Sequence, residues 1–132
     1  MTGLRGYQVV GVLRAENIAR ARTFYTDVLG LEERGLSGPT REGAFLAGGD
    51  SAIYIYERPG MPAPQNTTLA FSVPAAEFDA TIADLRGRGV AFEDYDVPEI
   101  GLKTVNGIAE FDGDRVAWFK DTEGNIVSLG TM

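Results

Sequence analysis

The sequence contains no cysteine and no histidine among its 132 residues. Without cysteine, the chain can form no disulfide, thiolate metal site or cysteine nucleophile. Without histidine, it can form no Ser-His-Asp triad, no histidine-ligated zinc or iron site and no imidazole base. Side-chain chemistry is therefore left to carboxylates, tyrosines, hydroxyls, arginines and two lysines, Lys103 and Lys120.

Long apolar runs are also missing. No segment approaches the ~18 residues that a membrane-spanning helix needs, and the segment Met1–Tyr7 has no apolar signal region. The net charge of −7 would repel nucleic-acid phosphates and anionic membranes. We therefore expect a cytoplasmic protein that binds neither nucleic acid nor membrane.

The first half of the chain has the pattern of a strand, a helix and three further strands. Tyr7–Leu13 is apolar and β-branched, which is typical of a strand. Asn17 is a suitable N-cap for the helix that follows, and Gly30 is a suitable C-terminal stop. The later strands are expected at Leu31–Leu36, Gly43–Ala47 and Ser51–Glu57.

A connector at residues 59–66, which contains three of the six prolines, separates this half from a second one. The same order of elements then repeats. We expect a strand at Thr67–Val73, a helix from Pro74 to Gly89, strands at Val90–Asp94, Gly107–Phe111, Arg115–Lys120 and Ile126–Leu129, and a loop over 95–106.

The repeated order predicts an α+β fold made of two βαβββ modules. Module one spans about 5–58 and module two about 67–130. One module alone cannot bury both faces of its sheet, whereas two packed modules can. We therefore expect a single domain over residues 1–132.

Two motifs resemble the vicinal oxygen chelate superfamily, which includes glyoxalase I, extradiol dioxygenases and bleomycin-resistance proteins. The first is segment 17–31, with Phe24-Tyr25 followed by Leu29-Gly30-Leu31. The second is Asp121-Thr122-Glu123-Gly124-Asn125, which is similar to the family's Asp-Pro-Asp-Gly-Asn turn before the last strand. The resemblance implies a curled mixed sheet around a cavity, with the helices on its outer face.

The resemblance also locates the four positions where metal enzymes of this family place His, Gln or Glu ligands. They fall here on Val10, Tyr54, Thr68 and Ser128, and a shift of two residues would offer Gln8 in place of Val10. Valine cannot coordinate a metal, and the three hydroxyls are poor ligands for zinc, nickel or iron. We therefore expect a member with no metal and no cofactor, although an oxygen-ligand site built from scattered carboxylates stays open.

The strand at residues 51–57 is expected to line the cavity. Tyr54 and Tyr56 share one face of it, where they would form an aromatic wall with hydroxyls that orient a ligand. Ordinary cross-strand packing is the other interpretation. By their positions, Thr68 and Ser128 are further candidate ligand contacts.

Further candidates lie in the second half. Trp118 and Phe119 point to opposite faces, and we take Trp118 as the cavity residue, although alternation alone does not decide between them. Tyr95 and Lys103 belong to the 95–106 loop, which either covers the cavity as a lid or is a plain surface excursion. We expect Asp121 to cap its own turn.

The sequence is compatible with two main functions and one further alternative. The first is a metal-free homodimeric small-molecule-binding protein, with an aromatic and acid-rimmed cavity for an apolar or cationic ligand. The second is a metal-free isomerase, lyase or hydrolase on a secondary metabolite, with Glu57 or Glu110 acting together with Tyr54. A divalent-metal lyase or dioxygenase with an unusual oxygen-ligand site is a third alternative.

Overall fold

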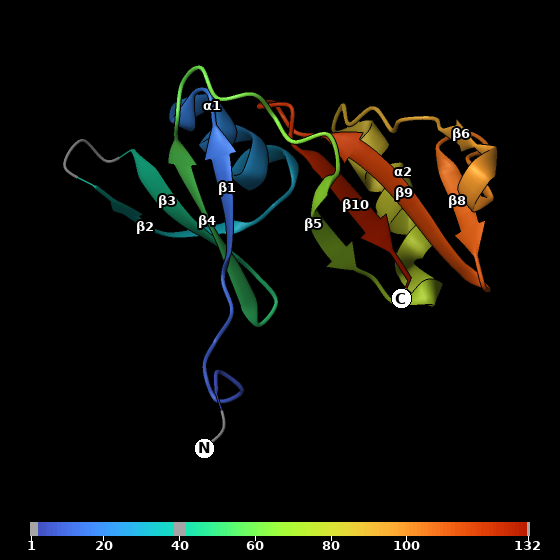
Figure 1. Ribbon diagram of the computed structural model, residues 1–132, viewed down its shortest axis with the longest axis horizontal. Coiled ribbons are helices and arrows are strands. Elements are labelled where there is room, and N and C mark those ends of the chain that lie inside the picture. The colour runs from blue at the N-terminus through green and yellow to red at the C-terminus, as the bar shows by residue number, and fades with distance from the viewer. Residues whose placement is uncertain (1–2, 39–41, 132) are drawn as a thin grey trace.

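The computed structural model describes residues 3–38 and 42–131 as two βαβββ modules side by side (Figure 1). The α+β fold expected from the repeated element order is confirmed. The first module contains strands β1 (Gly11–Ala15), β2 (Glu32–Ser37), β3 (Gly43–Gly48) and β4 (Ser51–Glu57). They form a sheet in the order β1-β4-β3-β2, with β1 parallel to β4.

The helix of the first module is α1 (Ile18–Thr23), which continues into a π-helical turn over Phe24–Val28. The predicted N-cap is confirmed, because the side chain of Asn17 accepts a hydrogen bond from the backbone N–H of Arg20 at 3.0 Å. The predicted stop is also confirmed, since Gly30 has φ +80°, a conformation that glycine adopts at little cost.

The second module repeats this topology. Its main sheet has the order β5-β10-β9-β8, with β5 parallel to β10. Its elements are β5 (Thr67–Ser72), a 3₁₀ turn (Ala75–Glu77), α2 (Phe78–Gly87), β8 (Ile108–Phe111), β9 (Asp114–Lys120) and β10 (Ile126–Gly130). A small hairpin, β6 (Asp96–Val97) and β7 (Leu102–Lys103), flanks a 3₁₀ turn at Pro98–Ile100.

One strand prediction and one loop prediction in the second module were wrong. Val90–Asp94 is not a strand: Phe92 makes only an isolated bridge to Phe119. The edge of β9 that this segment approaches is already paired with β8 over residues 114–117, so only the end of β9 is free for it. The expected 95–106 loop, in turn, contains the β6–β7 hairpin.

The first strand begins later than the predicted Tyr7. The parallel pairing of β1 with β4 begins at Gly11, opposite Ile53. Continued backwards, this register would place Val9 opposite Ser51, the first residue of β4, so β4 offers no partner to residues 3–8. The segment before β1 extends away from the sheet (Figure 1).

Each helix covers one face of its own sheet. In the first module, Ala21 and Tyr25 are buried together with the strand residues Leu13, Leu46 and Ile55. In the second, α2 is buried against β9 and β10 through Phe78, Ile82, Leu85, Phe119 and Val127. Phe24, Leu29 and Leu69 pack against both clusters, so the two cores are continuous.

The turn at residues 121–125 joins the modules through buried polar contacts. Asp121 caps this turn as predicted, because its Oδ1 accepts the backbone N–H groups of Glu123 at 2.8 Å and Asn125 at 2.9 Å. Its Oδ2 accepts a hydrogen bond from the hydroxyl of Tyr25, in the first module, at 2.6 Å. Burial of Tyr25 and the adjacent Asp121 carboxylate raise the pKa of this tyrosine, so it stays a donor.

Glu123 makes the second connection, and its side chain is fully buried. Its carboxylate accepts hydrogen bonds from the side chain of Arg20 at 2.9 Å and from the backbone N–H of Asn17 at 2.8 Å, both in the first module, and from the Thr122 hydroxyl. Burial opposes ionisation, but these hydrogen bonds outweigh it and hold the pKa of Glu123 below its ordinary value.

Replacing Glu123 by Gln should lower the free energy of unfolding by about 2 kcal/mol at pH 7, because the amide nitrogen of the buried Gln side chain cannot accept the hydrogen bonds that the carboxylate takes from Arg20, Asn17 and Thr122. A carboxyl whose pKa is lowered by folding stabilises the protein above its unfolded pKa, here 4.5. That contribution is lost as the pH falls through the lower folded value. Urea unfolding of both proteins should therefore show the difference at pH 7 and lose it below the folded pKa.

The matched control is Glu32→Gln. Glu32 pairs with Arg34 at 3.4 Å, but its side chain is 72% exposed, so its loss should have no measurable effect on unfolding. Equal destabilisation by the two substitutions, or a Glu123→Gln effect that does not change with pH, would contradict the proposed role of this turn.

Candidate functional site

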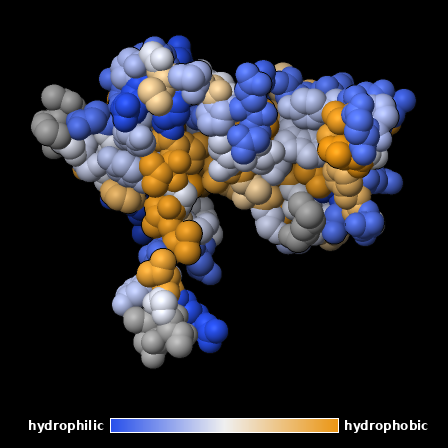
Figure 2. Space-filling model, viewed as in Figure 1, coloured by the Kyte–Doolittle hydropathy of each residue, from blue (hydrophilic) through white to orange (hydrophobic). Residues whose placement is uncertain are grey.

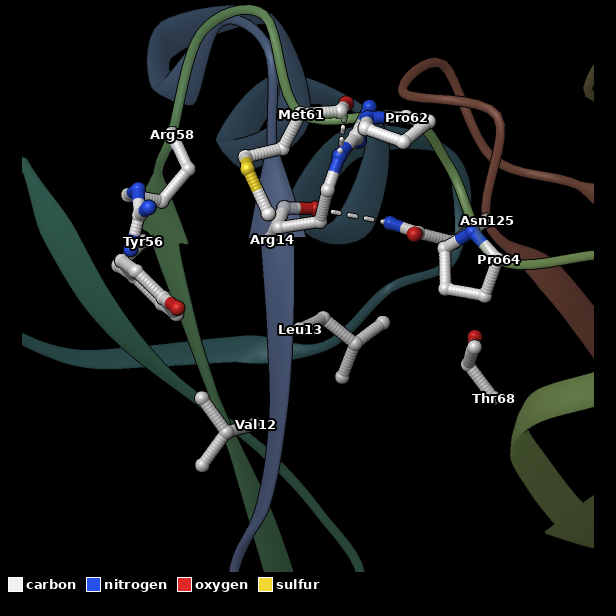
Figure 3. Close-up of a pocket in the computed structure, with 10 residues that line it drawn as sticks. All are labelled: Val12, Leu13, Arg14, Tyr56, Arg58, Met61, Pro62, Pro64, Thr68 and Asn125. Carbon is white, nitrogen blue, oxygen red and sulfur yellow. Dashed lines mark hydrogen bonds between the residues drawn. The ribbon is translucent and has the colours of Figure 1, made fainter.

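A cavity of about 430 Å³ lies between the modules (Figure 3). It is bordered by the edge strand β1 of the first sheet, by the 59–66 connector and by the edge strand β5 of the second sheet. Strands β1 and β4 supply one wall, and the connector, β5 and the 121–125 turn supply the other. The lining residues are Val12, Leu13, Arg14, Tyr56, Arg58, Met61, Pro62, Pro64, Thr68 and Asn125.

Arg14 fixes the geometry of this cavity. Its Nε donates to the carbonyl of Met61 at 3.0 Å, and its two terminal nitrogens donate to the carbonyl of Glu123 at 2.9 and 3.0 Å. In return, the Asn125 side-chain amide donates to the carbonyl of Arg14 at 2.9 Å (Figure 3). One residue of β1 therefore holds both the connector and the 121–125 turn in place.

The predicted tyrosine pair lies on the face of the first sheet away from α1. The rings of Tyr54 and Tyr56 are stacked, with centroids 6.0 Å apart and planes at 12°. Tyr56 lines the cavity, whereas the Tyr54 hydroxyl hydrogen-bonds Ser37 at 2.8 Å and its ring contacts Phe45. Tyr54 therefore packs against Tyr56 and helps to fix the orientation of its ring.

Trp118 and Tyr95 meet in a second cavity, of about 310 Å³. Their rings pack edge to face at 5.6 Å, and the Trp118 indole N–H donates to the Thr67 hydroxyl at 3.2 Å. Phe119 is buried in the core, so Trp118 is the residue of this pair on the open face of the sheet.

The 95–106 excursion that carries Tyr95 is closed at its base. The Asp94 carboxylate accepts hydrogen bonds from the Thr104 hydroxyl and from the backbone N–H of Gly107, both at 2.8 Å. These two bonds lower the pKa of Asp94. The fixed base and the buried Leu102 indicate an ordered hairpin that forms part of the second cavity.

The remaining predicted contacts are dispersed. Thr68 lines the first cavity, with its hydroxyl donating to the carbonyl of Ile126 at 3.1 Å. Ser128 is buried in β10, opposite Trp118 in the strand register. Lys103 and Glu110 both line a third cavity of about 460 Å³.

The two carboxylates predicted as candidate bases do not approach Tyr54 together. Glu57 accepts a hydrogen bond from the backbone N–H of Ile18 at 2.9 Å and so caps the start of α1. Glu110 is exposed on β8, in the other sheet, and is opposite Arg115 in the register. Neither residue lines the first cavity.

The donor set at the four family ligand positions does not fit a divalent metal. Val10 has no donor atom, the hydroxyl of Tyr54 is bonded to Ser37, and that of Thr68 is bonded to a backbone carbonyl. Across residues 3–38 and 42–131, no three carboxylates are grouped closely enough to hold a metal ion. The alternative oxygen-ligand site therefore finds no support in the described part of the chain.

Sequence reasoning missed Arg14 and Arg58 as cavity residues. A signal for Arg14 was present, because it continues the alternation of Val10 and Val12 along the first strand. Arg58 follows the last residue of β4 and had no such signal. The lining also differs from the acidic rim that we expected, since its two charged side chains are both arginines.

None of the helices in the described residues has the length and apolar character to cross a bilayer.

Residues 8–129 match the family described as Glyoxalase/Bleomycin resistance protein/Dioxygenase superfamily. A search of curated proteins finds no relative.

Three solved structures illustrate the similarity of fold. A glyoxalase family protein from Enterococcus faecalis is 21% identical, with a TM-score of 0.70 over 97% of this chain and 99% of that one. The fosfomycin resistance protein FosX from Mesorhizobium loti is 16% identical, with a TM-score of 0.66 over 96% and 92%. The oxidase ChaP-H2 is 25% identical, with a TM-score of 0.68 over 96% and 94%.

The position of Tyr54 depends on Gly43, because a Cβ there would collide with the Tyr54 hydroxyl and lie 2.6 Å from its Cζ. Gly43→Ala should displace this ring, break its bond to Ser37 and reduce the free energy of unfolding by about 1–3 kcal/mol. Chemical unfolding of the variant measures the loss.

Gly35→Ala is the control, because a Cβ at this position on the neighbouring strand meets nothing within 4 Å. In a double-mutant cycle, Tyr54→Leu should relieve most of the Gly43→Ala penalty. A penalty of the same size with and without Tyr54 would show that the ring is not what Gly43 accommodates.

Proposed function

This chain belongs to the Glyoxalase/Bleomycin resistance protein/Dioxygenase superfamily, and within it we propose a metal-free small-molecule-binding function. The ligand occupies the 430 Å³ cavity between the modules, a volume within the usual range for small-molecule sites. Tyr56 and Thr68 contact it directly, and Tyr54 holds Tyr56 in place.

One observation carries the proposal: the wall of this cavity offers apolar and aromatic surface without a catalytic pair. Val12, Leu13, Met61 and the two prolines contribute aliphatic surface, and Tyr56 contributes an aromatic face. No carboxylate is among the ten lining residues. Such a wall favours burial of an apolar ligand body, because removal of apolar surface from water drives binding.

The enzyme alternative needs a general base within hydrogen-bond reach of the bound substrate. Glu57 is occupied at the start of α1, and Glu110 lies on another sheet, along another cavity. The carboxylate and tyrosine pair expected for an isomerase, lyase or hydrolase is therefore not assembled at this cavity. Binding without turnover is the function that the geometry supports better.

We propose further that the protein is a homodimer. Large apolar side chains are exposed along residues 3–10 and on the open face of the first sheet, where Figure 2 shows a continuous hydrophobic stripe. Their exposed fractions are Leu4 80%, Tyr7 60%, Val9 87%, Val12 60% and Phe45 40%. An apolar patch of this kind marks an interaction site, and a second copy of the chain is the partner that we propose.

Binding is tested with N-phenyl-1-naphthylamine, a neutral aromatic probe whose fluorescence rises in apolar surroundings. Wild-type protein should bind it, and Tyr56→Ala should weaken binding by about tenfold, the effect of losing one aromatic contact. Tyr95→Ala is the matched control, because Tyr95 lines the second cavity. Loss of binding in Tyr95→Ala but not in Tyr56→Ala would show that the probe binds in the second cavity, and it would contradict the proposed site.

Native mass spectrometry of freshly purified protein tests the assembly and the metal content together. We expect a dimer without a stoichiometric divalent metal. Val9→Asp should shift it to a monomer, because Val9 is 87% exposed and lies outside the cavity lining, and its replacement would place a charge in the apolar interface. A wild-type monomer would contradict the dimer. A dimer that carries one divalent metal per chain would contradict the metal-free assignment.

A further inference from the structure

Two arginines line the cavity between the modules, and they differ from most of the other arginines in their partners. Five arginines elsewhere form ion pairs with carboxylates: Arg20, Arg22, Arg34, Arg88 and Arg115. Within residues 3–38 and 42–131, no ion pair joins Arg14 or Arg58 to a carboxylate. The chain has 19 acidic residues against 12 basic ones, so two unpaired guanidinium groups at one cavity need an explanation.

Arg14 is the more constrained of the two. It is half-buried, and the acceptors of its three hydrogen bonds are neutral backbone carbonyls. These bonds use three of the five N–H donors of a guanidinium. The hydrogen bonds of Arg14 leave two donors without an acceptor among the described residues, and none of them neutralises the positive charge. Because Arg14 is half-buried, an opposite charge beside it would be attracted more strongly than in bulk solvent.

Arg58 brings a second guanidinium to the same wall. It is exposed, and Figure 3 shows its side chain extending beside Tyr56. Both arginines belong to the lining of one cavity, so a negative group bound there would be attracted by two positive charges. None of the other eight lining side chains carries a negative charge.

We propose that the cavity selects a ligand with an apolar, aromatic body and one oxyanion group, such as a carboxylate or a sulfonate. This inference rests on the proposed binding function and specifies its ligand class. The oxyanion accepts charge-assisted hydrogen bonds from Arg58 and from the free donors of Arg14, a geometry to which guanidinium groups are well suited. The apolar body lies against Tyr56, Val12 and Met61.

This ligand class reverses the expectation of a cationic ligand. That expectation followed from the net charge of −7, which describes the whole surface. Affinity depends on the groups that face the ligand, and at this cavity the two charged groups are positive. A cation would therefore meet like charge, which disfavours it.

The test compares two probes that share one aromatic skeleton. N-phenyl-1-naphthylamine is neutral, and 8-anilinonaphthalene-1-sulfonate carries the same rings with a sulfonate. Wild-type protein should bind the sulfonate about tenfold more tightly than the neutral probe, the effect of one charge-assisted contact. The preference should shrink as the salt concentration rises, and the two probes should compete for one site.

Arg58→Gln should reduce the ratio of the two affinities to about threefold, because one of the two positive groups of the cavity lining remains. Arg14 is left intact, because its substitution would also disturb the connector. Arg34→Gln is the matched control: it removes the same charge from β2, where Arg34 is exposed and pairs with Glu32, and it should keep the wild-type ratio.

The possible outcomes separate the inference from the function. Equal affinity of wild type for the two probes would overturn the oxyanion preference and leave the binding function standing. Failure of both probes to bind would overturn the binding function itself. A sulfonate preference that is undiminished in Arg58→Gln, or binding of the sulfonate without competition from the neutral probe, would show that the anion is held elsewhere.

Discussion

The structure depends on two buried carboxylates in one short turn. Asp121 and Glu123 belong to the second module, yet they accept hydrogen bonds from Tyr25, Asn17 and Arg20 in the first. A buried carboxylate is tolerated only when it is paired and hydrogen-bonded. No buried side-chain nitrogen or oxygen in the described part of the chain lacks a partner. The two modules therefore satisfy each other's polar groups in addition to sharing an apolar core.

The cavity follows from the same constraint. The 121–125 turn holds Arg14 through the carbonyl of Glu123 and the amide of Asn125, and Arg14 holds the connector through the carbonyl of Met61. Strand β1, the connector and β5 are thereby fixed around a space that neither module fills. The residues that build the fold and those that would meet a ligand are linked through a single arginine.

The sequence was informative where local chemistry decides structure. The N-cap at Asn17, the stop at Gly30 and the capping by Asp121 each need only neighbouring residues, and all three are confirmed. The Val90–Asp94 segment failed as a strand because β8, rather than this segment, pairs with most of β9. Local propensity does not reveal such competition between segments for one strand edge.

The site was harder to predict for the same reason. Tyr25 and Asp121 are 96 positions apart, and Arg14 and Glu123 are 109 apart, so no local pattern relates them. Tyr56 was identified by strand alternation and does line the cavity. Alternation could not separate it from Tyr54, whose hydroxyl is taken by Ser37. Net charge was misleading for the cavity, because it averages over surfaces that a ligand does not contact.

The central claim is that a ligand binds between the modules, against the residues that the 121–125 turn positions. Side-chain N–H signals in a ¹H–¹⁵N NMR spectrum, recorded while N-phenyl-1-naphthylamine is added, test it most directly. The account predicts that the Asn125 amide and Arg14 Nε signals shift on binding, while the indole signal of Trp118, the single tryptophan, stays in place. Shifts confined to Trp118 would contradict it and locate the ligand in the second cavity.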